Sequence, residues 1–192
     1  QLLDEGWHFG DYPGANKDTL NNAEWMHQLY TRADAHFTGR ATVPVLWDKK
    51  TGTIVNNESA DIVRIFNSGF GDLARNDIDL YPALLREAIA RLNAEIYPNL
   101  NNGVYRAGFA TTQVSYQEAV SDVFTMLDKL EARFATQDFL AGGQLTEADI
   151  RLFVTLVRFE AAYHGLCECN LRKLAEYASL DRYLRTMLAV PG

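Results

Sequence analysis

The spacing of hydrophobic residues in the second half of the chain predicts amphipathic helices. In residues 115–134, the side chains that recur at three- and four-residue steps are Tyr116, Ala119, Val120, Val123, Phe124, Leu127, Leu130 and Phe134. Such steps place side chains on one face of an α-helix. Residues 82–97 and 179–188 have the same spacing, and residues 145–163 are apolar nearly all round, which predicts a buried central helix.

The first 70 residues mix two periodicities and predict a small α/β part. Residues 42–47 and 53–56 are β-branched and apolar, and the turn-forming segment 48–52 joins them. Helical stripes precede and follow this hairpin at residues 19–37 and 59–66. We therefore expect an α/β domain over residues 1–70 and an all-helical domain over residues 71–192, with the boundary near residues 69–79.

The sequence Leu-Thr-Glu-Ala-Asp predicts the start of the central helix. Thr146 is placed to cap that helix, and Asp149 can accept a hydrogen bond from the Thr146 backbone N–H. Leu145 and Ile150 occupy the two positions of a hydrophobic staple. These features indicate where a helix begins, and we assign them no chemistry.

Composition narrows the range of functions. A net charge of −7, with scattered lysines and arginines, argues against nucleic-acid binding, and no apolar run approaches the ~20 residues of a membrane span. Cys167 and Cys169 are too close to bridge readily, and two thiols without clustered histidines are too few for a zinc site. We expect a cytoplasmic protein, because reduced thiols are typical of the cytosol, with no metal, no nucleic acid and no membrane partner.

The segment 39–66 has features that a structural hairpin does not need. Pro44 cannot donate a backbone hydrogen bond, so its strand is an edge strand or ends there. If the Val43–Pro44 peptide bond is cis, the backbone groups of Val43 turn outward and can pair with an extended ligand. This is the pattern of β-augmentation by a peptide.

Glu58 and Ser59 occupy the junction between the second strand and the next helix. The Ser59 hydroxyl and the first free amides of the helix can bind a carboxylate, and Glu58 can accept a hydrogen bond from an ammonium group. Alternatively, Ser59 only caps the helix and Glu58 is solvated. The Val-Pro segment one hairpin earlier favours the first interpretation, with a short peptide that has a free amino acid head as the ligand.

Val-Pro followed by Glu-Ser, and then by a helical domain with the Leu-Thr-Glu-Ala-Asp cap, resembles a glutathione transferase. The longer strings GWHF, GRATVPVLWDKKTGTIVNNESADIVRIFN, DLYP, NNGVYRAGFATTQ and LTEADIRLFVTLVRF are similar to the glutathionyl-hydroquinone reductases, the Xi class. The similarity covers almost the whole chain. It implies a glutathione-transferase fold, in which residues 1–70 are part of a thioredoxin-like domain and residues 71–192 are the all-helical domain.

The resemblance also implies a glutathione site. The positions that match it are Trp7, Arg40, Ala41, Thr42, Val43, Glu58 and Ser59. Val43 would present its backbone to the cysteinyl residue of glutathione, and Glu58 and Ser59 would hold the γ-glutamyl head. Without the resemblance, Trp7 is better explained as an aromatic residue that fills the core.

Two tyrosines would complete the chemistry that the resemblance implies. Tyr105 would face the quinone ring as a proton donor and acceptor, and Tyr163 would help to stabilise the catalytic thiolate. The alternative for Tyr163 is a buried tyrosine whose hydroxyl is satisfied. The implied reaction reduces a glutathionyl-hydroquinone to the hydroquinone through a mixed disulfide between glutathione and a cysteine, with glutathione as co-substrate and a homodimer as the assembly.

The implied nucleophile is a cysteine in a Cys-Pro-Trp-Ala motif at a helix start, where a thiol pKa is lowered. No Cys-Pro occurs in the 192 residues. Cys167 and Cys169 lie late in the helical part and are not expected to replace it. We expect the first strand and first helix to precede Gln1, and the piece as given to be inactive.

Two other functions remain open. One is an omega- or lambda-like transferase that removes glutathione from a wider range of substrates. The other is a non-catalytic glutathione-binding module. Activity on a glutathionyl-quinone compared with a small mixed disulfide separates the first from a hydroquinone reductase, and binding without turnover would indicate the second.

Overall fold

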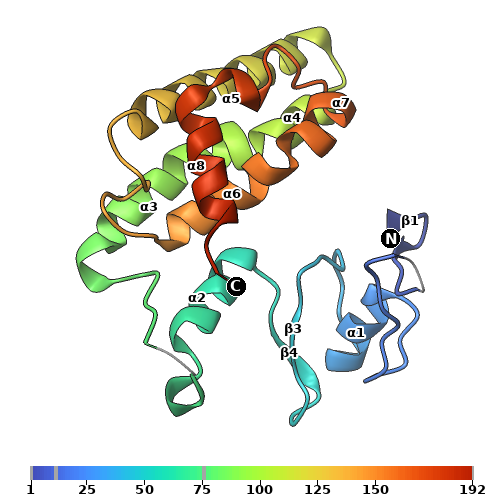
Figure 1. The fold of residues 1–192 in the computed structure, drawn as a ribbon. Coiled ribbons are helices and arrows are strands. Elements are labelled where there is room, and N and C mark those ends of the chain that lie inside the picture. The colour runs from blue at the N-terminus through green and yellow to red at the C-terminus, as the bar shows by residue number, and fades with distance from the viewer. Residues whose placement is uncertain (1, 11–12, 75–76, 192) are drawn as a thin grey trace. The chain divides into compact units, whose positions relative to one another are not determined.

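The computed structural model describes residues 2–10, 13–74 and 77–191 (Figure 1). Contacts between residues divide the protein into two compact units, residues 1–75 and residues 76–192. The boundary expected near residues 69–79 includes Arg75 and Asn76, which lie outside the described residues.

The first unit combines short strands with short helices. Two antiparallel pairs of strands form separate two-stranded sheets, so the structure has a hairpin near residue 5 that the sequence pattern did not indicate. In sequence order the elements are β1 (Leu2–Leu3), β2 (Gly6–Trp7), α1 (Met26–Ala33), β3 (Leu46–Asp48), β4 (Thr53–Asn56), α2 (Ser59–Ser68) and the 3-10 turn η1 (Gly71–Leu73).

The predicted hairpin is present, but its first strand is shorter than expected. Strand β3 begins at Leu46, so Pro44 precedes the strand rather than lying within it. The connecting turn is fixed by Asp48, which accepts hydrogen bonds from the Lys50 N–H at 2.8 Å and the Thr51 hydroxyl at 2.6 Å. Proline fits before a strand because it cannot donate to the ladder.

The helix expected over residues 19–37 is also shorter than predicted. Asp18 accepts hydrogen bonds from the backbone N–H groups of Leu20, Asn21 and Ala23, which holds that stretch as a loop. Helix α1 starts only at Met26, and the Gln28 side chain accepts hydrogen bonds from the two N–H groups just before it. Local side-chain hydrogen bonds therefore override the weak helical stripe.

The regular elements in the described part of the second unit are helical, apart from an isolated β-bridge between Phe139 and Gly142. Its longer helices are α3 (Arg86–Ile96), α4 (Gly103–Gly108), α5 (Gln113–Phe134), α6 (Glu147–Arg158) and α8 (Ala178–Leu188). The shorter turns between them are η2 (Ala83–Leu85), η3 (Tyr97–Asn101), η4 (Phe159–Tyr163), α7 (His164–Leu166) and η5 (Leu174–Glu176).

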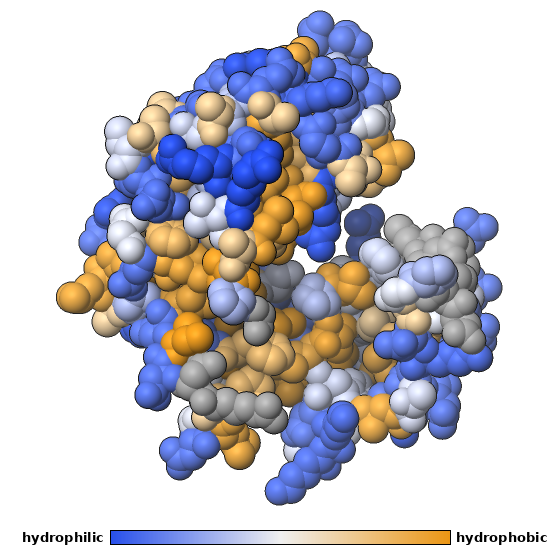
Figure 2. Space-filling view, in the orientation of Figure 1, coloured by the Kyte–Doolittle hydropathy of each residue, from blue (hydrophilic) through white to orange (hydrophobic). Residues whose placement is uncertain are grey.

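Helix α5 forms the centre of the hydrophobic core, and its stripe is confirmed. All the predicted core positions of this helix are buried except Tyr116, which is half-buried. Helix α5 contacts α4 and α8, and α6 packs against α3 and α8. On the face shown in Figure 2, hydrophobic side chains, drawn orange, come to the surface among hydrophilic ones.

Helix α6 differs from the prediction in length and burial. The α-helix ends at Arg158 and continues as the π-helical turn η4, rather than as one regular helix to Tyr163. Leu152 and Leu156 are buried in the core, but Val154 and Val157 are exposed. A π-turn shifts the register of the side chains that follow it, and Tyr163 at its end meets Tyr105 of helix α4.

The predicted capping box at the start of α6 is confirmed. The Asp149 carboxylate accepts hydrogen bonds from the Thr146 N–H at 2.9 Å and the Thr146 hydroxyl at 2.8 Å. It also accepts from the Leu140 N–H at 2.8 Å and the Tyr183 hydroxyl at 3.2 Å. Asp149 is fully buried, and this burial raises its pKa above the usual range.

Another carboxylate fixes the start of the last helix, α8. The Glu131 side chain, on α5, accepts hydrogen bonds from the Ser179 N–H, 3.0 Å from each carboxylate oxygen, and from the Leu180 N–H at 2.9 Å. These amides belong to the first turn of α8, where no intrahelical partner is available. The cap therefore comes from a residue distant in sequence.

None of the helices in the described part of the protein combines the length and apolar character that crossing a membrane requires.

Candidate functional site

The segment that contains Val43 is open to solvent. Val43 is 40% exposed, and the peptide bond to Pro44 is cis. Within residues 2–10, 13–74 and 77–191, neither the N–H nor the C=O of Val43 has a hydrogen-bond partner. Both groups are therefore able to pair with an extended ligand, as β-augmentation requires.

The expected head-group site lies at the start of helix α2. Glu58 is the N-cap residue, and Ser59 is the first helical residue rather than the residue before the helix. The first helical hydrogen bond runs from the Ile62 N–H to the Glu58 C=O at 3.0 Å. The N–H groups of residues 59–61 therefore have no acceptor within the helix, and they can bind a carboxylate.

Glu58 does not cap the helix through its side chain. Its backbone N–H donates to the Asn56 side-chain oxygen at 2.6 Å, which fixes the bend between β4 and α2. The Glu58 side chain is exposed. Its carboxylate is thus available to a cationic group, and the alternative in which Ser59 serves only as the N-cap does not match the position of Ser59.

Hydrogen bonds join the two halves of this expected site. The Asn57 side-chain amide donates to the Thr42 hydroxyl oxygen at 3.2 Å and to the Tyr30 hydroxyl oxygen at 3.0 Å. The Tyr30 hydroxyl in turn donates to the Thr42 C=O at 2.9 Å. Thr42 precedes Val43 and Asn57 precedes Glu58, so the structure brings these two segments together within the first unit.

The sequence pattern did not assign roles to Tyr30 and Asn57. Tyr30 lies in a short apolar stripe, where a tyrosine is expected to fill the core. Asn57 is the second asparagine of the Asn-Asn-Glu-Ser string, whose polar character inside a strand-to-helix junction was the only available signal.

The remaining expected contacts are exposed or partly exposed. Trp7, at the end of β2, is 37% exposed, and α1 contacts both β2 and β4. Arg40 is exposed and Ala41 is partly buried. Gly39, just before Arg40, has φ +151°, and a Cβ there would lie 3.3 Å from the Phe37 ring. A glycine thus lets this segment approach Phe37 closely.

The second unit contains a pair of tyrosines. The hydroxyl oxygens of Tyr105, on α4, and Tyr163, at the end of η4, are 3.0 Å apart, and their rings meet edge to face. Tyr105 is 45% exposed, whereas Tyr163 is buried. The structure therefore joins the two tyrosines that the sequence analysis selected from positions 58 residues apart.

The environment of Tyr163 keeps its hydroxyl protonated. Burial raises the pKa of Tyr163, and the hydrogen bond and the charge of Tyr105 raise it further, while Arg158 opposes the shift. A phenol with a raised pKa is a hydrogen-bond donor over the neutral range. One hydroxyl of the pair can donate to the other, while the exposed Tyr105 can bind a polar atom of a ligand.

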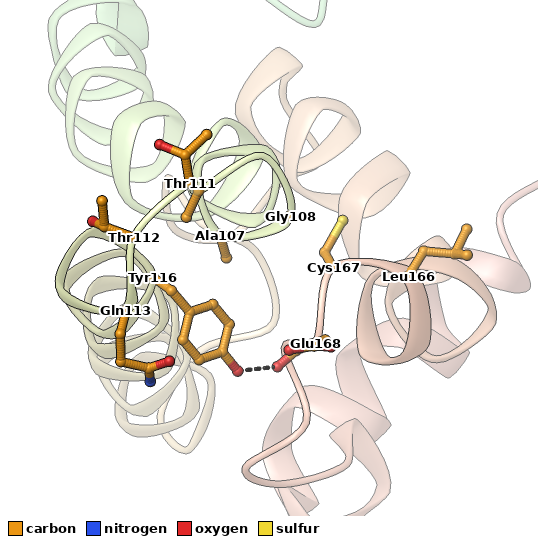
Figure 3. A pocket seen from close by; sticks show the side chains of 10 residues that line it. Ala107, Gly108, Thr111, Thr112, Gln113, Tyr116, Leu166, Cys167 and Glu168 are labelled. Carbon is orange, nitrogen blue, oxygen red and sulfur yellow. Dashed lines mark hydrogen bonds between the residues drawn. The ribbon is translucent and has the colours of Figure 1, made fainter.

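The two cysteines lie in a different environment. Cys167 lines a cavity of about 360 Å³, with Tyr116 pointing across it to donate to the Glu168 C=O at 2.7 Å (Figure 3). The Cys167 Sγ would lie 2.6 Å from a Cβ at Gly108, so the thiol packs against the backbone of α4.

Burial raises the pKa of both thiols, that of Cys169 to about 12 with a contribution from the Cys167 charge. A reactive cysteine needs a lowered pKa, so neither residue has the properties of a nucleophile. Among the described residues, no three His, Cys, Asp or Glu side chains cluster in a way that could hold a metal ion.

Comparison with known proteins identifies the family. Residues 113–186 match the family model of the glutathione S-transferase C-terminal domain. The protein is 50% identical over all of its 192 residues to the glutathionyl-hydroquinone reductase YqjG of Escherichia coli, and covers 58% of that relative. The glutathione-bound structure of YqjG superposes with a TM-score of 0.96, at 49% identity over 99% of this chain and 62% of the other.

A more distant structure decides the class. The Xi glutathione transferase ECM4 of Saccharomyces cerevisiae, in complex with glutathione, has a TM-score of 0.92 and 31% identity over 99% of this chain and 71% of its own. The chain belongs to the Xi class of glutathione transferases.

The Xi-class assignment confirms the glutathione-transferase fold expected from the sequence. The chain spans 58% of the length of the E. coli relative. Of the expected site residues, those for glutathione lie in the first unit, where Asn57 hydrogen-bonds to Thr42, and Tyr105 and Tyr163 lie in the second. Their roles remain predictions.

Proposed function

We propose that this protein reduces glutathionyl-hydroquinones to hydroquinones with glutathione as co-substrate. One observation supports this function most: the chain aligns along its whole length, at 50% identity, with a relative named glutathionyl-hydroquinone reductase. The glutathione-bound structures of two relatives support the co-substrate. The domains are residues 1–70, which bind glutathione, and residues 71–192, which are helical.

Glutathione binds to the first unit as an extended peptide. The unpaired N–H and C=O of Val43 hydrogen-bond to the cysteinyl residue, with Trp7, Arg40, Ala41 and Thr42 around the peptide. The γ-glutamyl carboxylate binds at the N-terminus of α2 near Ser59, and Glu58 accepts from the γ-glutamyl ammonium group. The carboxylate and the ammonium group of the head thus both find partners of opposite charge or polarity at one strand-to-helix junction.

In this proposal the nucleophile is the cysteine of the Cys-Pro-Trp-Ala motif that the family resemblance implies, a motif that the 192 residues do not contain. Its thiolate attacks the sulfur of the glutathionyl group, the carbon–sulfur bond to the ring breaks, and the bonding pair stays on the ring carbon. A proton then adds to that carbon and gives the hydroquinone, while glutathione remains on the cysteine as a mixed disulfide. A second glutathione thiolate displaces the cysteine and leaves as oxidised glutathione.

The tyrosine pair acts in the proton step. Tyr105 is the exposed member, so it contacts the ring and donates the proton. The single O–H of Tyr163 stabilises the thiolate before the attack, and it donates to the Tyr105 oxygen afterwards, as negative charge develops there. A raised pKa of Tyr163 suits this role, because the group stays protonated when its neighbour loses a proton.

The intact enzyme is a cytoplasmic homodimer in this proposal. The test is turnover of glutathionyl-menadione compared with turnover of the mixed disulfide of glutathione and 2-mercaptoethanol. We expect the quinone adduct to be the better substrate by kcat/KM. A preference for the small mixed disulfide would indicate an omega-like transferase, and glutathione binding without turnover of either compound would indicate a binding module.

A further inference from the structure

We propose that Tyr30 and Asn57 are positioning residues that hold the two halves of the glutathione site at a fixed separation. This inference depends on the proposed function, because it concerns how that site binds the tripeptide. Neither residue is expected to touch glutathione. Each would act through the segment next to it, Tyr30 through Thr42 and Asn57 through Glu58.

Hydrogen bonds of the Tyr30 hydroxyl link the two segments. Its hydroxyl donates to the Thr42 C=O at 2.9 Å and accepts from the Asn57 amide at 3.0 Å, and the side chain is only 4% exposed. The Thr42 hydroxyl oxygen lies 3.3 Å from the same hydroxyl, so the polar contacts of this buried group are to Thr42 and Asn57. The C=O that it holds is part of the peptide link between Thr42 and Val43, so the orientation of that peptide unit is fixed.

The Tyr30 ring supports the same segment at its other end. The Phe37 ring packs on it with centroids 4.8 Å apart, and Phe37 in turn lies under Gly39. Tyr30 thus holds Thr42 by a direct hydrogen bond and approaches Gly39 only through the Phe37 ring. This segment contains no helix or strand that could hold it by its own backbone hydrogen bonds.

Asn57 extends this support to the start of α2. Its amide bonds to Tyr30 and to the Thr42 hydroxyl at 3.2 Å, and the next residue is the N-cap of the helix. Glutathione would bind Val43 through its cysteinyl residue and Glu58 through its γ-glutamyl group. The distance between Val43 and Glu58 must therefore match the length of the bound peptide. If this distance is already fixed in the free protein, binding does not lose the conformational entropy that ordering a flexible site would cost.

The hydroxyl deletion Tyr30→Phe in the intact protein tests this inference. The probe is S-methylglutathione, whose blocked sulfur makes the titration independent of the catalytic cysteine. We expect Kd to rise about ten-fold, because two neighbouring polar groups lose their partner while the ring is retained. The KM for glutathione should rise in parallel, and kcat at saturating glutathione should stay within about two-fold, since a positioning residue outside the chemistry changes binding rather than turnover.

Tyr116→Phe is the matched control, because it removes a hydroxyl that donates one hydrogen bond to a backbone carbonyl in the second unit. It should leave the Kd unchanged. If Tyr30→Phe does not fold, Asn57→Ala tests the same link, because it removes the amide that donates to Tyr30 and Thr42.

The results distinguish a failure of the proposed function from a failure of the positioning role. A wild-type protein that does not bind S-methylglutathione would overturn the proposed function and this inference with it. A wild-type protein that binds, together with variants of unchanged Kd, would overturn the positioning role alone. A loss of binding that follows a fall in melting temperature, without the split between KM and kcat, would also overturn it.

Discussion

The hydroxyl oxygens of Tyr105 and Tyr163 lie 3.0 Å apart, with the first tyrosine exposed and the second buried. This arrangement gives the two phenols different properties although their chemistry is the same. Burial raises the pKa of the Tyr163 phenol, and the exposed Tyr105 phenol is accessible to solvent and ligands. Such a difference in environment is how enzymes assign separate roles to identical groups.

We expect Tyr105→Phe in the intact protein to lower kcat for glutathionyl-menadione by roughly 100-fold or more, the usual contribution of a general acid. The Kd for S-methylglutathione should not change, because Tyr105 does not belong to the proposed peptide site. Steady-state kinetics and a binding titration measure the two effects. An unchanged kcat would exclude Tyr105 as the proton donor.

We expect Glu58→Ala together with Ser59→Ala to weaken glutathione binding by ~2–4 kcal/mol, the scale of losing charge-assisted hydrogen bonds. Calorimetric titration of the intact protein gives the difference in binding free energy. The control is Asp72→Ala, which removes another acidic side chain in the first unit. Equal affinities for the double variant and the wild type would remove both residues from the site.

We expect Asp149→Ala to lower the free energy of unfolding by ~2–4 kcal/mol, because the substitution removes the helix cap and leaves the buried Leu140 N–H without an acceptor. Urea denaturation measures the loss. Asp122→Ala removes an exposed carboxylate that pairs with Arg106, so it should cost only ~0–1 kcal/mol. Similar losses for the two variants would contradict the assigned role of Asp149.

The raised pKa of the Cys169 thiol leads us to expect that the stability of the protein depends on pH. The pKa of a cysteine in an unfolded protein is about 8.5, and burial raises that of Cys169 to about 12 in the folded protein. Between these values the folded state binds more protons than the unfolded state, so the free energy of unfolding falls as pH rises. The contribution is fully present below pH ~8.5 and is lost toward about pH 12.

The measurement compares urea denaturation of the wild type and Cys169→Ala from about pH 7 to about pH 11. The difference in stability between the two proteins should be constant up to about pH 8.5 and should shrink above it. A difference that stays constant over the whole range would contradict the raised pKa.

The sequence predicted well those features that depend on periodicity or on neighbouring residues. The core face of α5 and the capping box of Thr146 and Asp149 were predicted at the residue level. Strand β4 also has the predicted limits, Thr53–Asn56. In each case the signal lies within a few residues of the element that it specifies.

Features that depend on distant contacts were not predicted. The contact between Thr42 and Asn57 joins loop segments through polar side chains, which leave no periodic pattern. The end of α6 at Arg158 and the turn that follows it lie inside a continuous apolar run, so the pattern predicted one helix where the structure has two segments. The site residues from the resemblance, such as Trp7 and Tyr105, remain predictions that binding and kinetic measurements on variants test.

The cap that Glu131 supplies to α8 has a consequence for the order of folding. The amide of Ser179 in α8 is capped by a carboxylate 48 positions earlier, so the first turn of this helix gains its cap only when α5 has formed nearby. A peptide containing α8 alone should therefore be largely unstructured in water. In the intact protein, the amides of Ser179 and Leu180 should exchange with solvent no more slowly than those of the α5 segment around Glu131, which makes the last helix a reporter of order in the core.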